Sequence, residues 1–435
     1  MRKTAVIFVA QLLIAGAVLA QTPPPQAPIP AGTTRPWTNV VGGEWPRTDS
    51  QLRVHFRVNA PKAQSVTVNL GPTTLTKGED GYWTGITPPQ NPGFHIYRLT
   101  MDGVELNDTA SEAFWDSGGV YSGIDIAEPG IDHYDVKNVP HGEVRSFWYY
   151  AKTTGEHRHA YVYTPPGYDA NPKQRYPVLY LLHGMNQDRT VWSHQGRANF
   201  ILDNLIAEGK AKPMILVMED GGIVNRSMGP RGGAGARQGA RGAAGAPAGA
   251  PAAGAPGSPR GAGAPGQPPA QAGAPGGRGA GPGAGGGPNF WDAFCKTMIT
   301  DVIPTIDAHY RTLADREHRA IAGLSLGGAQ TYQITQANLD TFAYIGVFSG
   351  APFGMSGIET AYGGLLTKPA EFAKKVKVFY ISMGSKEGPG AGRNMHEALE
   401  KAGVKHVYFE AQGTAHEFET WRKSLHGYAP LLFQQ

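Results

Sequence analysis

The sequence predicts an α/β fold in which a mostly parallel sheet, covered by helices on both faces, follows a small all-β sandwich. Two observations predict it. Short runs that alternate apolar and polar residues, punctuated by Gly, Pro, Asn and Asp, fill residues 36–135. Continuous apolar runs then alternate with helical patterns over residues 136–435. The first pattern is typical of paired antiparallel sheets, and the second of a doubly covered parallel sheet.

Residues 1–20 have the pattern of a signal peptide. Arg2 and Lys3 precede an apolar run from Ala5 to Leu19, and small residues stand at the expected cleavage point. The run is shorter than a typical membrane span, although an uncleaved anchor is the alternative. We therefore expect a secreted or periplasmic protein that has no stable membrane association after cleavage.

A Pro-rich stretch over residues 21–35 predicts an extended linker before the sandwich. Within the sandwich, the alternating runs predict strands at 53–58, 65–70, 82–86 and 95–99. Three aromatic residues of this region, Trp83, Tyr97 and Trp115, either pack in the core or in an inter-domain contact, or stack on sugar rings. Packing is the favoured interpretation.

The apolar runs of residues 136–435 predict the strands of the parallel sheet. These strands are expected at 160–163, 177–182, 214–218, 320–324, 344–348, 376–383 and 406–409. Helices are expected around 200–206, 294–310 and 417–432. The only cysteine, Cys295, lies in one of these helical patterns, so we expect a buried thiol and no internal disulfide.

Residues 227–288 interrupt this domain with Gly, Ala, Pro, Gln and scattered Arg. The insertion has almost no apolar side chains to bury, so it cannot offset its ordering entropy and is predicted to be disordered. Together with Arg226 it carries six arginines and no acid. It is either a solubilising spacer or a weak attractor of acidic polysaccharide. The formal net charge of the whole chain, +4, is too small to predict nucleic-acid binding.

The segment Gly323-Leu324-Ser325-Leu326-Gly327 has the pattern Gly-x-Ser-x-Gly. It lies between a predicted buried strand and a predicted helix, which places Ser325 on a sharp strand-to-helix turn. The backbone of such a turn is strained, and the residues two positions away must be small, a need that Gly323 and Gly327 meet. The pattern predicts Ser325 as a nucleophile, and an ordinary Gly-rich turn is the alternative.

A serine nucleophile needs a histidine base, and the base needs an acid that holds its tautomer. In folds with this motif the chain order is serine, acid, histidine. After Ser325, only His416 falls in a loop beyond the last predicted strand. The other candidates, His396, His406 and His426, fall in predicted helices or a strand. We therefore expect His416 to be the base.

The acid is expected in the loop that follows the predicted strand 376–383. Glu387 is the only carboxylate of that loop, and Glu410 and Glu417 are the alternatives. The alternative is that Glu387 is a surface residue beside Lys386 with no catalytic role.

An oxyanion intermediate needs two backbone amides aimed at it. We expect one from Leu326, directly after the nucleophile, and one from Met185, in the turn after the strand that ends at Leu182. Gly184 keeps the backbone close there, and the His183 side chain is expected to be structural.

Together these motifs resemble the esterase D family of putative esterases, which includes feruloyl and acetyl-xylan esterases, enterochelin esterases and mycolyltransferases. The resemblance covers roughly residues 140–435 apart from the insertion. It rests on Leu182-His183-Gly184, Trp192, the segment from Gly323 to Gly328, His416 and Trp421-Arg422. It implies an α/β-hydrolase fold. Many family members have Asp where this chain has Glu387. Residues 36–130 are similar to the early-set, immunoglobulin-like domains that precede such esterases.

The resemblance implies a secreted serine esterase that forms an acyl-enzyme, with a feruloyl or acetyl ester of a plant cell-wall-type polysaccharide as substrate. A siderophore esterase or a sugar acyltransferase with the same triad is the alternative, and a non-catalytic glycan-binding protein is a further one. We expect no cofactor, no metal and no nucleic-acid partner, and the oligomeric state stays open. Glu156, His157 and His159 cluster, but they lie in a predicted turn without the spacing of metal ligands.

Overall fold

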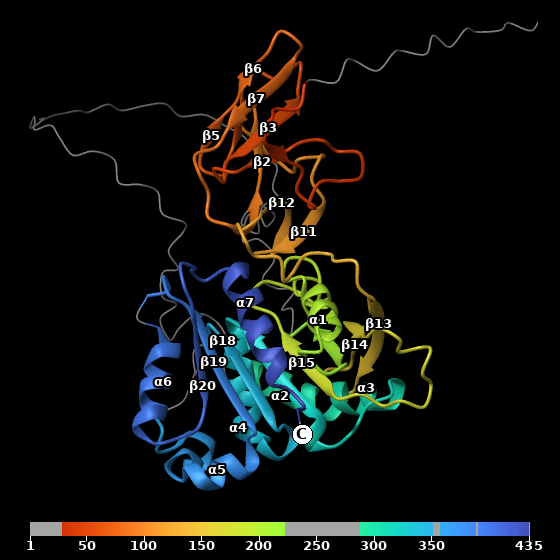
Figure 1. Cartoon of the computed structure of the whole chain (residues 1–435), viewed down its shortest axis with the longest axis vertical. Coiled ribbons are helices and arrows are strands. Elements are labelled where there is room, and N and C mark those ends of the chain that lie inside the picture. The colour runs from red at the N-terminus through yellow and green to blue at the C-terminus, as the bar shows by residue number, and fades with distance from the viewer. Residues whose placement is uncertain (1–27, 222–287, 351–356, 389, 435) are drawn as a thin grey trace, which may run out of the picture.

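The computed structural model describes residues 28–221, 288–350, 357–388 and 390–434. The expected signal peptide, residues 21–27 of the expected linker and nearly all of the expected disordered insertion lie outside the described residues. Figure 1 shows an all-β region, drawn in red and orange, beside an α/β region that runs from yellow to blue. Among the described helices, none combines the length and apolar character that a membrane crossing needs.

The all-β region consists of three antiparallel sheets. The first has the order β1 (Thr33–Thr34), β2 (Arg47–Asp49), β3 (Val54–Asn59), β7 (Tyr82–Ile86) and β6 (Thr76–Lys77). The second has the order β10 (Val104–Leu106), β9 (Leu99–Met101), β4 (Val66–Val68) and β5 (Thr73–Thr74). The third has the order β11 (Ala113–Asp116), β12 (Gly119–Ile126) and β8 (Gly93–Tyr97). The four predicted strands correspond to β3, β4, β7 and β8.

The core of the all-β region follows from its alternating pattern. Along β3, Val54, Phe56 and Val58 are buried, whereas the residues between them are only partly covered. Trp83 and Tyr97 are 7% and 0% exposed and belong to this core, as the favoured interpretation held, while Trp115 stays 39% exposed.

The predicted boundary between the linker and the sandwich was wrong. Thr33 and Thr34 fall inside the predicted linker, yet they form β1 and pair with Asp49 and Thr48 of β2. The physical reason is that β2 would otherwise be an edge strand with unpaired backbone groups on that side.

The α/β region is built on an eight-stranded sheet. Its order is β13 (Glu143–Ala151), β14 (Glu156–Thr164), β16 (Ile215–Glu219), β15 (Val178–Leu182), β17 (Arg319–Leu324), β18 (Tyr344–Phe348), β19 (Val378–Gly384) and β20 (Val407–Ala411). The strands from β16 to β20 in this order pair in parallel, and β13 and β14 add an antiparallel edge. All five residues of β15 and all five of β16 are buried, as continuous apolar runs predict.

Helices cover both faces of this sheet. The helices are α1 (Ala198–Ala207), α2 (Pro288–Thr297), α3 (Ile303–His309), α4 (Leu326–Ala337), α5 (Pro369–Lys375), α6 (Ala391–Lys401) and α7 (Phe418–Tyr428). The shorter helical turns are η2 (Met298–Val302), η3 (Arg316–His318), η4 (Leu339–Thr341), η5 (Ala361–Thr367) and η6 (Ala429–Leu431). Leu179 and Leu181 pack in a core with residues of α1 and α7, whereas Val178 and Tyr180 pack in another with residues of α2 and α3.

Two predicted helices differ in detail. The helix expected over 294–310 is interrupted by the π-helical turn η2, because Pro304 has no N–H with which to continue a regular helix. The helix expected over 417–432 ends as α7 at Tyr428, and Pro430 lies in the following turn η6.

The two regions meet across a buried ion pair. Arg422 of α7 donates to both carboxylate oxygens of Asp125 of β12, at 3.1 and 3.0 Å, and the side chains are 0% and 3% exposed. Trp37 Nε1 donates to the same carboxylate at 2.5 Å. Burial opposes the ionisation of Asp125, but the charge and hydrogen bonds of Arg422 outweigh it and hold the pKa of Asp125 below its usual value.

Candidate active site

The Gly-x-Ser-x-Gly segment forms the turn between β17 and α4. Ser325 has φ 51° and ψ −114°, outside the regions that L-residues favour. Its N–H donates to the Phe348 carbonyl at 2.8 Å, and its carbonyl accepts from the Ala329 N–H at 3.1 Å. These bonds to β18 and α4 hold the strained backbone in place. The sharp strand-to-helix turn expected from the sequence is present.

The two glycines of the motif are needed for close packing. A Cβ at Gly323 would lie 2.3 Å from the Gly327 carbonyl carbon, so a side chain there would collide with the turn itself. A Cβ at Gly327 would lie 2.6 Å from the carbonyl oxygens of Leu182 and His183. The absence of a side chain at Gly327 therefore brings the end of β15 against the Ser325 turn.

His416 reaches Ser325 from the loop between β20 and α7. Its Nε2 lies 2.8 Å from Ser325 Oγ, and its Nδ1 lies 3.0 Å from Glu387 Oε2. The His416 side chain is 48% exposed, so a substrate can approach it. Trp421 of α7 meets the His416 ring edge-on, with 5.1 Å between ring centroids. This contact limits how far the ring can turn toward α7.

The other candidate histidines lie elsewhere. His396 is on α6 and His406 directly precedes β20, and their rings hydrogen-bond to each other at 2.8 Å. His426 is on α7, where its ring centroid lies 4.4 Å from that of His133. The structure brings only His416 of the four to Ser325 Oγ.

Glu387 lies in the loop after β19, as expected, and accepts three hydrogen bonds. Besides His416, the donors are Ser349 Oγ at 2.6 Å and the Gly384 N–H at 2.7 Å. Burial opposes ionisation of Glu387, yet the bonds from His416, Ser349 and Gly384 outweigh it and lower its pKa. The side chain is 12% exposed, and it faces His416 as a carboxylate at neutral pH.

The alternative acids have other partners. Glu410 pairs with Arg393 at 2.9 Å, and Glu417 Oε1 accepts from the Ala415 N–H at 3.0 Å. Glu387 is the carboxylate that hydrogen-bonds to the His416 ring.

The two expected oxyanion donors lie at the start of α4 and in the loop after β15. Leu326 is the first residue of α4, where helix geometry leaves the N–H without an intrahelical acceptor. Met185 lies in the loop after β15 and is 60% exposed. Within the described ranges, neither the Met185 N–H nor the Leu326 N–H has a hydrogen-bond acceptor. His183 is buried beside them, and its Nδ1 bonds to the Gly184 carbonyl at 2.8 Å, which suits a structural role.

Sequence reasoning missed Ser349, which holds Glu387. Ser349 follows β18 at the same edge of the sheet, and its φ of 51° resembles that of Ser325. It accepts from Trp421 Nε1 at 3.1 Å while it donates to Glu387. Its position directly after a predicted buried strand is the signal that could have identified it.

The acid-and-histidine cluster near residue 157, which was expected in a turn, lies elsewhere. Glu156, His157 and His159 lie on β14 and not in a turn, because β13 and β14 pair as far as Ala151 and Glu156 and the turn falls between them. Within the described part of the chain, the side chains grouped closely enough to hold a metal ion are those of His396, Glu400 and His406.

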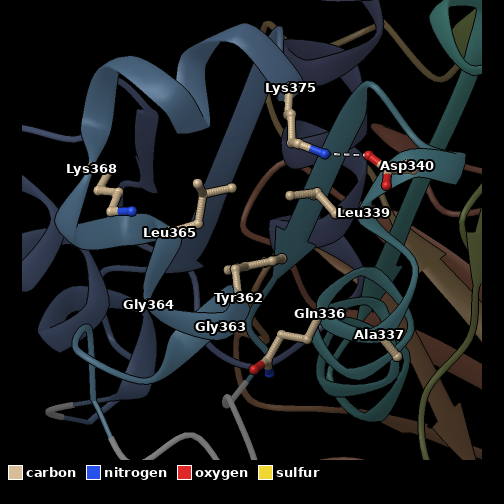
Figure 2. A pocket seen from close by; sticks show the side chains of 10 residues that line it. All are labelled: Gln336, Ala337, Leu339, Asp340, Tyr362, Gly363, Gly364, Leu365, Lys368 and Lys375. Carbon is tan, nitrogen blue, oxygen red and sulfur yellow. Dashed lines mark hydrogen bonds and ion pairs between the residues drawn. The ribbon is translucent and has the colours of Figure 1, made fainter.

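A hollow lies at the far end of α4 (Figure 2). Its lining includes Gln336 and Ala337 at the end of α4, and Lys375 pairs with Asp340 across it. Since α4 begins beside Ser325 and has 12 residues, the rise along the helix separates the two places by roughly 16 Å.

Comparison with known proteins places this chain in a family. Residues 151–248 and 248–432 match the family described as Putative esterase. An endo-1,4-beta-xylanase/feruloyl esterase from Xylanibacter ruminicola is 34% identical over 406 residues, which cover 91% of this chain and 47% of that protein. The chain thus spans about half the length of this curated relative.

Solved structures add a likeness in fold. An enterobactin esterase from Shigella flexneri, solved in the presence of enterobactin, has a TM-score of 0.54 at 11% identity, covering 88% of this chain and 93% of that chain. A ferulic acid esterase from Anaeromyces mucronatus has a TM-score of 0.47 at 23% identity, covering 70% and 96%. The predicted α/β-hydrolase fold is confirmed. The predicted class of carboxylic ester hydrolase agrees with these matches, and the chain belongs to the putative esterase family.

Proposed function

We propose that this chain is a serine esterase in which Ser325 is the nucleophile, His416 the general base and Glu387 the acid that orients the base. The observation that carries the proposal is the continuous hydrogen-bonded series from Ser325 Oγ through both ring nitrogens of His416 to Glu387 Oε2, at 2.8 and 3.0 Å. Such a series matches the roles of nucleophile, base and orienting acid.

In the first step, His416 Nε2 takes the Ser325 hydroxyl proton while the serine oxygen attacks the ester carbonyl carbon. The carbonyl oxygen becomes an oxyanion, which the N–H groups of Met185 and Leu326 stabilise. The carbon–oxygen bond to the alcohol then breaks, and His416 gives its proton to the departing alcohol. An acyl-Ser325 ester remains.

In the second step, a water molecule gives a proton to His416 Nε2 and its oxygen attacks the acyl carbon. The intermediate collapses to the free acid, and the proton returns to Ser325 Oγ. Glu387 stays ionised throughout, because its lowered pKa keeps it a carboxylate that accepts from the His416 Nδ1–H and stabilises the transient imidazolium.

For the substrate we infer a feruloyl or acetyl ester of a plant cell-wall-type polysaccharide. The name of the Xylanibacter ruminicola relative, which pairs xylanase with feruloyl esterase, supports this class. The signal-peptide pattern of residues 1–20 supports export to where such a polymer is found. The half-exposed His416 fits a polymer that reaches the site from outside.

Replacement of the nucleophile tests the chemistry. Ser325→Ala should lower kcat on methyl ferulate and p-nitrophenyl acetate by on the order of 10⁶-fold, because the nucleophile and its base act as a unit. Ser65→Ala, at an exposed serine of the all-β region, is the matched control. Covalent labelling by a fluorophosphonate should require Ser325. Turnover that survives in purified Ser325→Ala protein would refute the proposal, and a wild-type chain that takes no label would favour a non-catalytic glycan-binding protein.

An ester panel tests the substrate class. Feruloylated and acetylated xylan fragments should release ferulate or acetate faster than a catecholate trilactone is cleaved. Faster trilactone cleavage would favour a siderophore esterase, and an acylated sugar in place of free acid would favour an acyltransferase.

A further inference from the structure

The turn between β11 and β12 of the all-β region contacts the loop that contains Met185. Ser117 and Gly118 form this turn, both with positive φ, 47° and 77°, as tight hairpins with a two-residue turn require. The Gly118 N–H donates to the Asn186 carbonyl at 2.8 Å. Figure 1 shows β11 and β12 at the boundary with the α/β region.

The Gln187 side chain extends this contact, because it links Asp116 of the all-β region to Gly184, which precedes Met185. Gln187 Nε2 donates to Asp116 Oδ2 at 3.1 Å, and Gln187 Oε1 accepts from the Gly184 N–H at 2.9 Å. Gln187 therefore uses both ends of its amide, one toward the all-β region and one toward its own loop. The backbone on both sides of Met185 is bonded, at Gly184 and at Asn186, while the Met185 N–H is left without an acceptor among the described residues.

We propose that the β11–β12 turn positions the Met185 N–H through Asp116 and Gln187, so that the oxyanion hole is complete only when the all-β region is docked. The inference rests on the proposed function, because it takes Met185 as one of the two oxyanion donors. Asp116 and Gln187 are then positioning residues. The structural alternative is that these bonds only hold the two regions together.

The two interpretations predict different kinetics. An oxyanion donor acts only in the transition state, so a misplaced donor lowers kcat and leaves KM nearly unchanged. Loss of a donor costs about 10²- to 10³-fold in kcat, and a donor that is displaced but present should cost less. A contact that only joins the regions would lower the melting temperature and leave kcat per folded molecule unchanged.

Three variants test the inference with methyl ferulate as substrate. Gln187→Ala and Asp116→Ala should lower kcat by about 10- to 100-fold with KM within about threefold of wild type. The pH midpoint of kcat/KM should not move, because the bonds of His416 are untouched. Asp116→Asn keeps an oxygen that accepts from Gln187 and should restore most of the rate. Burial raises the pKa of Asp116, so replacing its carboxylate with an amide costs less here than at an exposed aspartate.

The control is Asp80→Ala, which removes an ion pair with Arg57 from the first sheet of the all-β region and should not change kcat. Wild-type kcat in Gln187→Ala and Asp116→Ala would overturn the positioning role, and so would an equal loss in Asp116→Asn and Asp116→Ala. If Asp116→Ala fails to fold, Gln187→Ala decides alone, since Gln187 belongs to the α/β region. Failure of the proposed function shows differently, as activity in Ser325→Ala.

A separate group of side chains lies between α6 and the start of β20. Figure 1 shows these two elements as neighbours. His396 Nδ1 lies 2.8 Å from His406 Nε2, and Glu400 Oε1 lies 3.9 Å from the same Nε2. The three ligand-type atoms lie within 4.8 Å of one another. The His406 side chain is 1% exposed and that of Glu400 is 66% exposed, so the group is buried at His406 and open to solvent at Glu400.

Neighbouring groups orient both rings. His406 Nδ1 donates to the Val404 carbonyl at 2.8 Å, which leaves the Nε2 lone pair of the neutral ring pointing into the group. A second ring nitrogen bonded to a backbone carbonyl is the arrangement usual for a metal-ligating histidine. The His396 ring is stacked on Tyr408, with 4.2 Å between centroids and 4° between planes. From this independent geometry we infer a binding site for a divalent transition metal such as Zn²⁺, with two histidines and one carboxylate as ligands.

Titration of the chelator-treated, untagged full chain with ZnCl₂ tests the site by calorimetry. We expect one saturable site and a rise in melting temperature, since a ligand of the native state stabilises it. His396→Ala and His406→Ala should weaken binding by more than about tenfold. His416→Ala and the exposed His309→Ala should bind as wild type does. Unsaturable binding, or unchanged binding in His396→Ala, would show that the two rings only hydrogen-bond to each other.

Discussion

The all-β region and the α/β region both enclose buried apolar cores, yet the all-β region distributes its charges unevenly. In its first sheet, Arg57 pairs with Asp80, whose side chain is 54% exposed. At the boundary, Asp125 is 3% exposed and pairs with Arg422 of the other region. The Asp125–Arg422 pair, with both side chains buried, thus lies where the all-β region meets α7. The pair favours docking of the two regions, because either buried charge without the other would be uncompensated.

The largest expected effect belongs to the α/β region alone. Glu387→Gln keeps the shape of the acid but removes its charge, and we expect kcat to fall roughly 10³- to 10⁴-fold, as when the carboxylate of a serine triad becomes an amide. Steady-state kinetics on methyl ferulate measure it. Glu410→Gln is the matched control, since Glu410 pairs with Arg393 and not with His416. An unchanged kcat in Glu387→Gln would assign the acid elsewhere.

The next effect compares the two aspartates of the all-β region. Asp125→Asn leaves Arg422 buried without its charge partner, so we expect the free energy of unfolding to fall by about 3–5 kcal/mol. Asp80→Asn breaks an exposed pair and should cost at most about 1 kcal/mol. Urea unfolding of the two variants measures both. Equal losses would remove the distinction between the boundary and the first sheet.

A smaller effect depends on pH and lies at the same boundary. Burial, together with the neighbouring Glu128 carboxyl, raises the pKa of Glu419 to about 8. Between the ordinary carboxyl pKa and about 8, the unfolded chain has lost this proton and the folded chain has kept it, so stability falls as pH rises. Glu419→Gln should therefore gain stability over wild type, more at pH 8.5 than at pH 5. Melting temperatures across this range measure the difference.

The exposed Glu105→Gln on β10 is the control for that pH series. It should follow the wild-type curve at every pH. A Glu419→Gln curve that runs parallel to wild type would mean that Glu419 titrates normally.

Much of the candidate site could be predicted because local rules constrain it. The strained turn at Ser325 requires small neighbours at Gly323 and Gly327, and this requirement is visible in five consecutive residues. His416 and Glu387 could be chosen because parallel strands bring their carboxyl ends to one edge of the sheet. The same rule would have found Ser349. Buried runs also predicted seven of the eight strands of the large sheet, each end within four residues. They missed the edge strand β13, whose residues are mostly exposed.

The rest depends on contacts that no local pattern contains. Asp116 and Gln187 are 71 positions apart and belong to different regions, so their hydrogen bond follows only from how the regions dock. Thr33 could not be recognised as part of a strand, because its pairing depends on the open edge of β2. Strand pairing likewise set the position of Glu156, which the turn prediction misplaced.

The ion pair between Arg422 and Asp125 has a consequence for building chimaeras. Trp421 contacts the His416 ring while the next residue, Arg422, holds the all-β region, and successive helical residues point about 100° apart. A foreign N-terminal module fused near residue 130 would remove the Asp125 carboxylate that compensates the buried Arg422 guanidinium. The guanidinium would keep the Gln195 carbonyl as an acceptor, and its charge would be uncompensated by Asp125 one residue from Trp421, which contacts His416. Grafts should therefore carry Asp125 and the β11–β12 turn with them, and exchange only the sheets beyond.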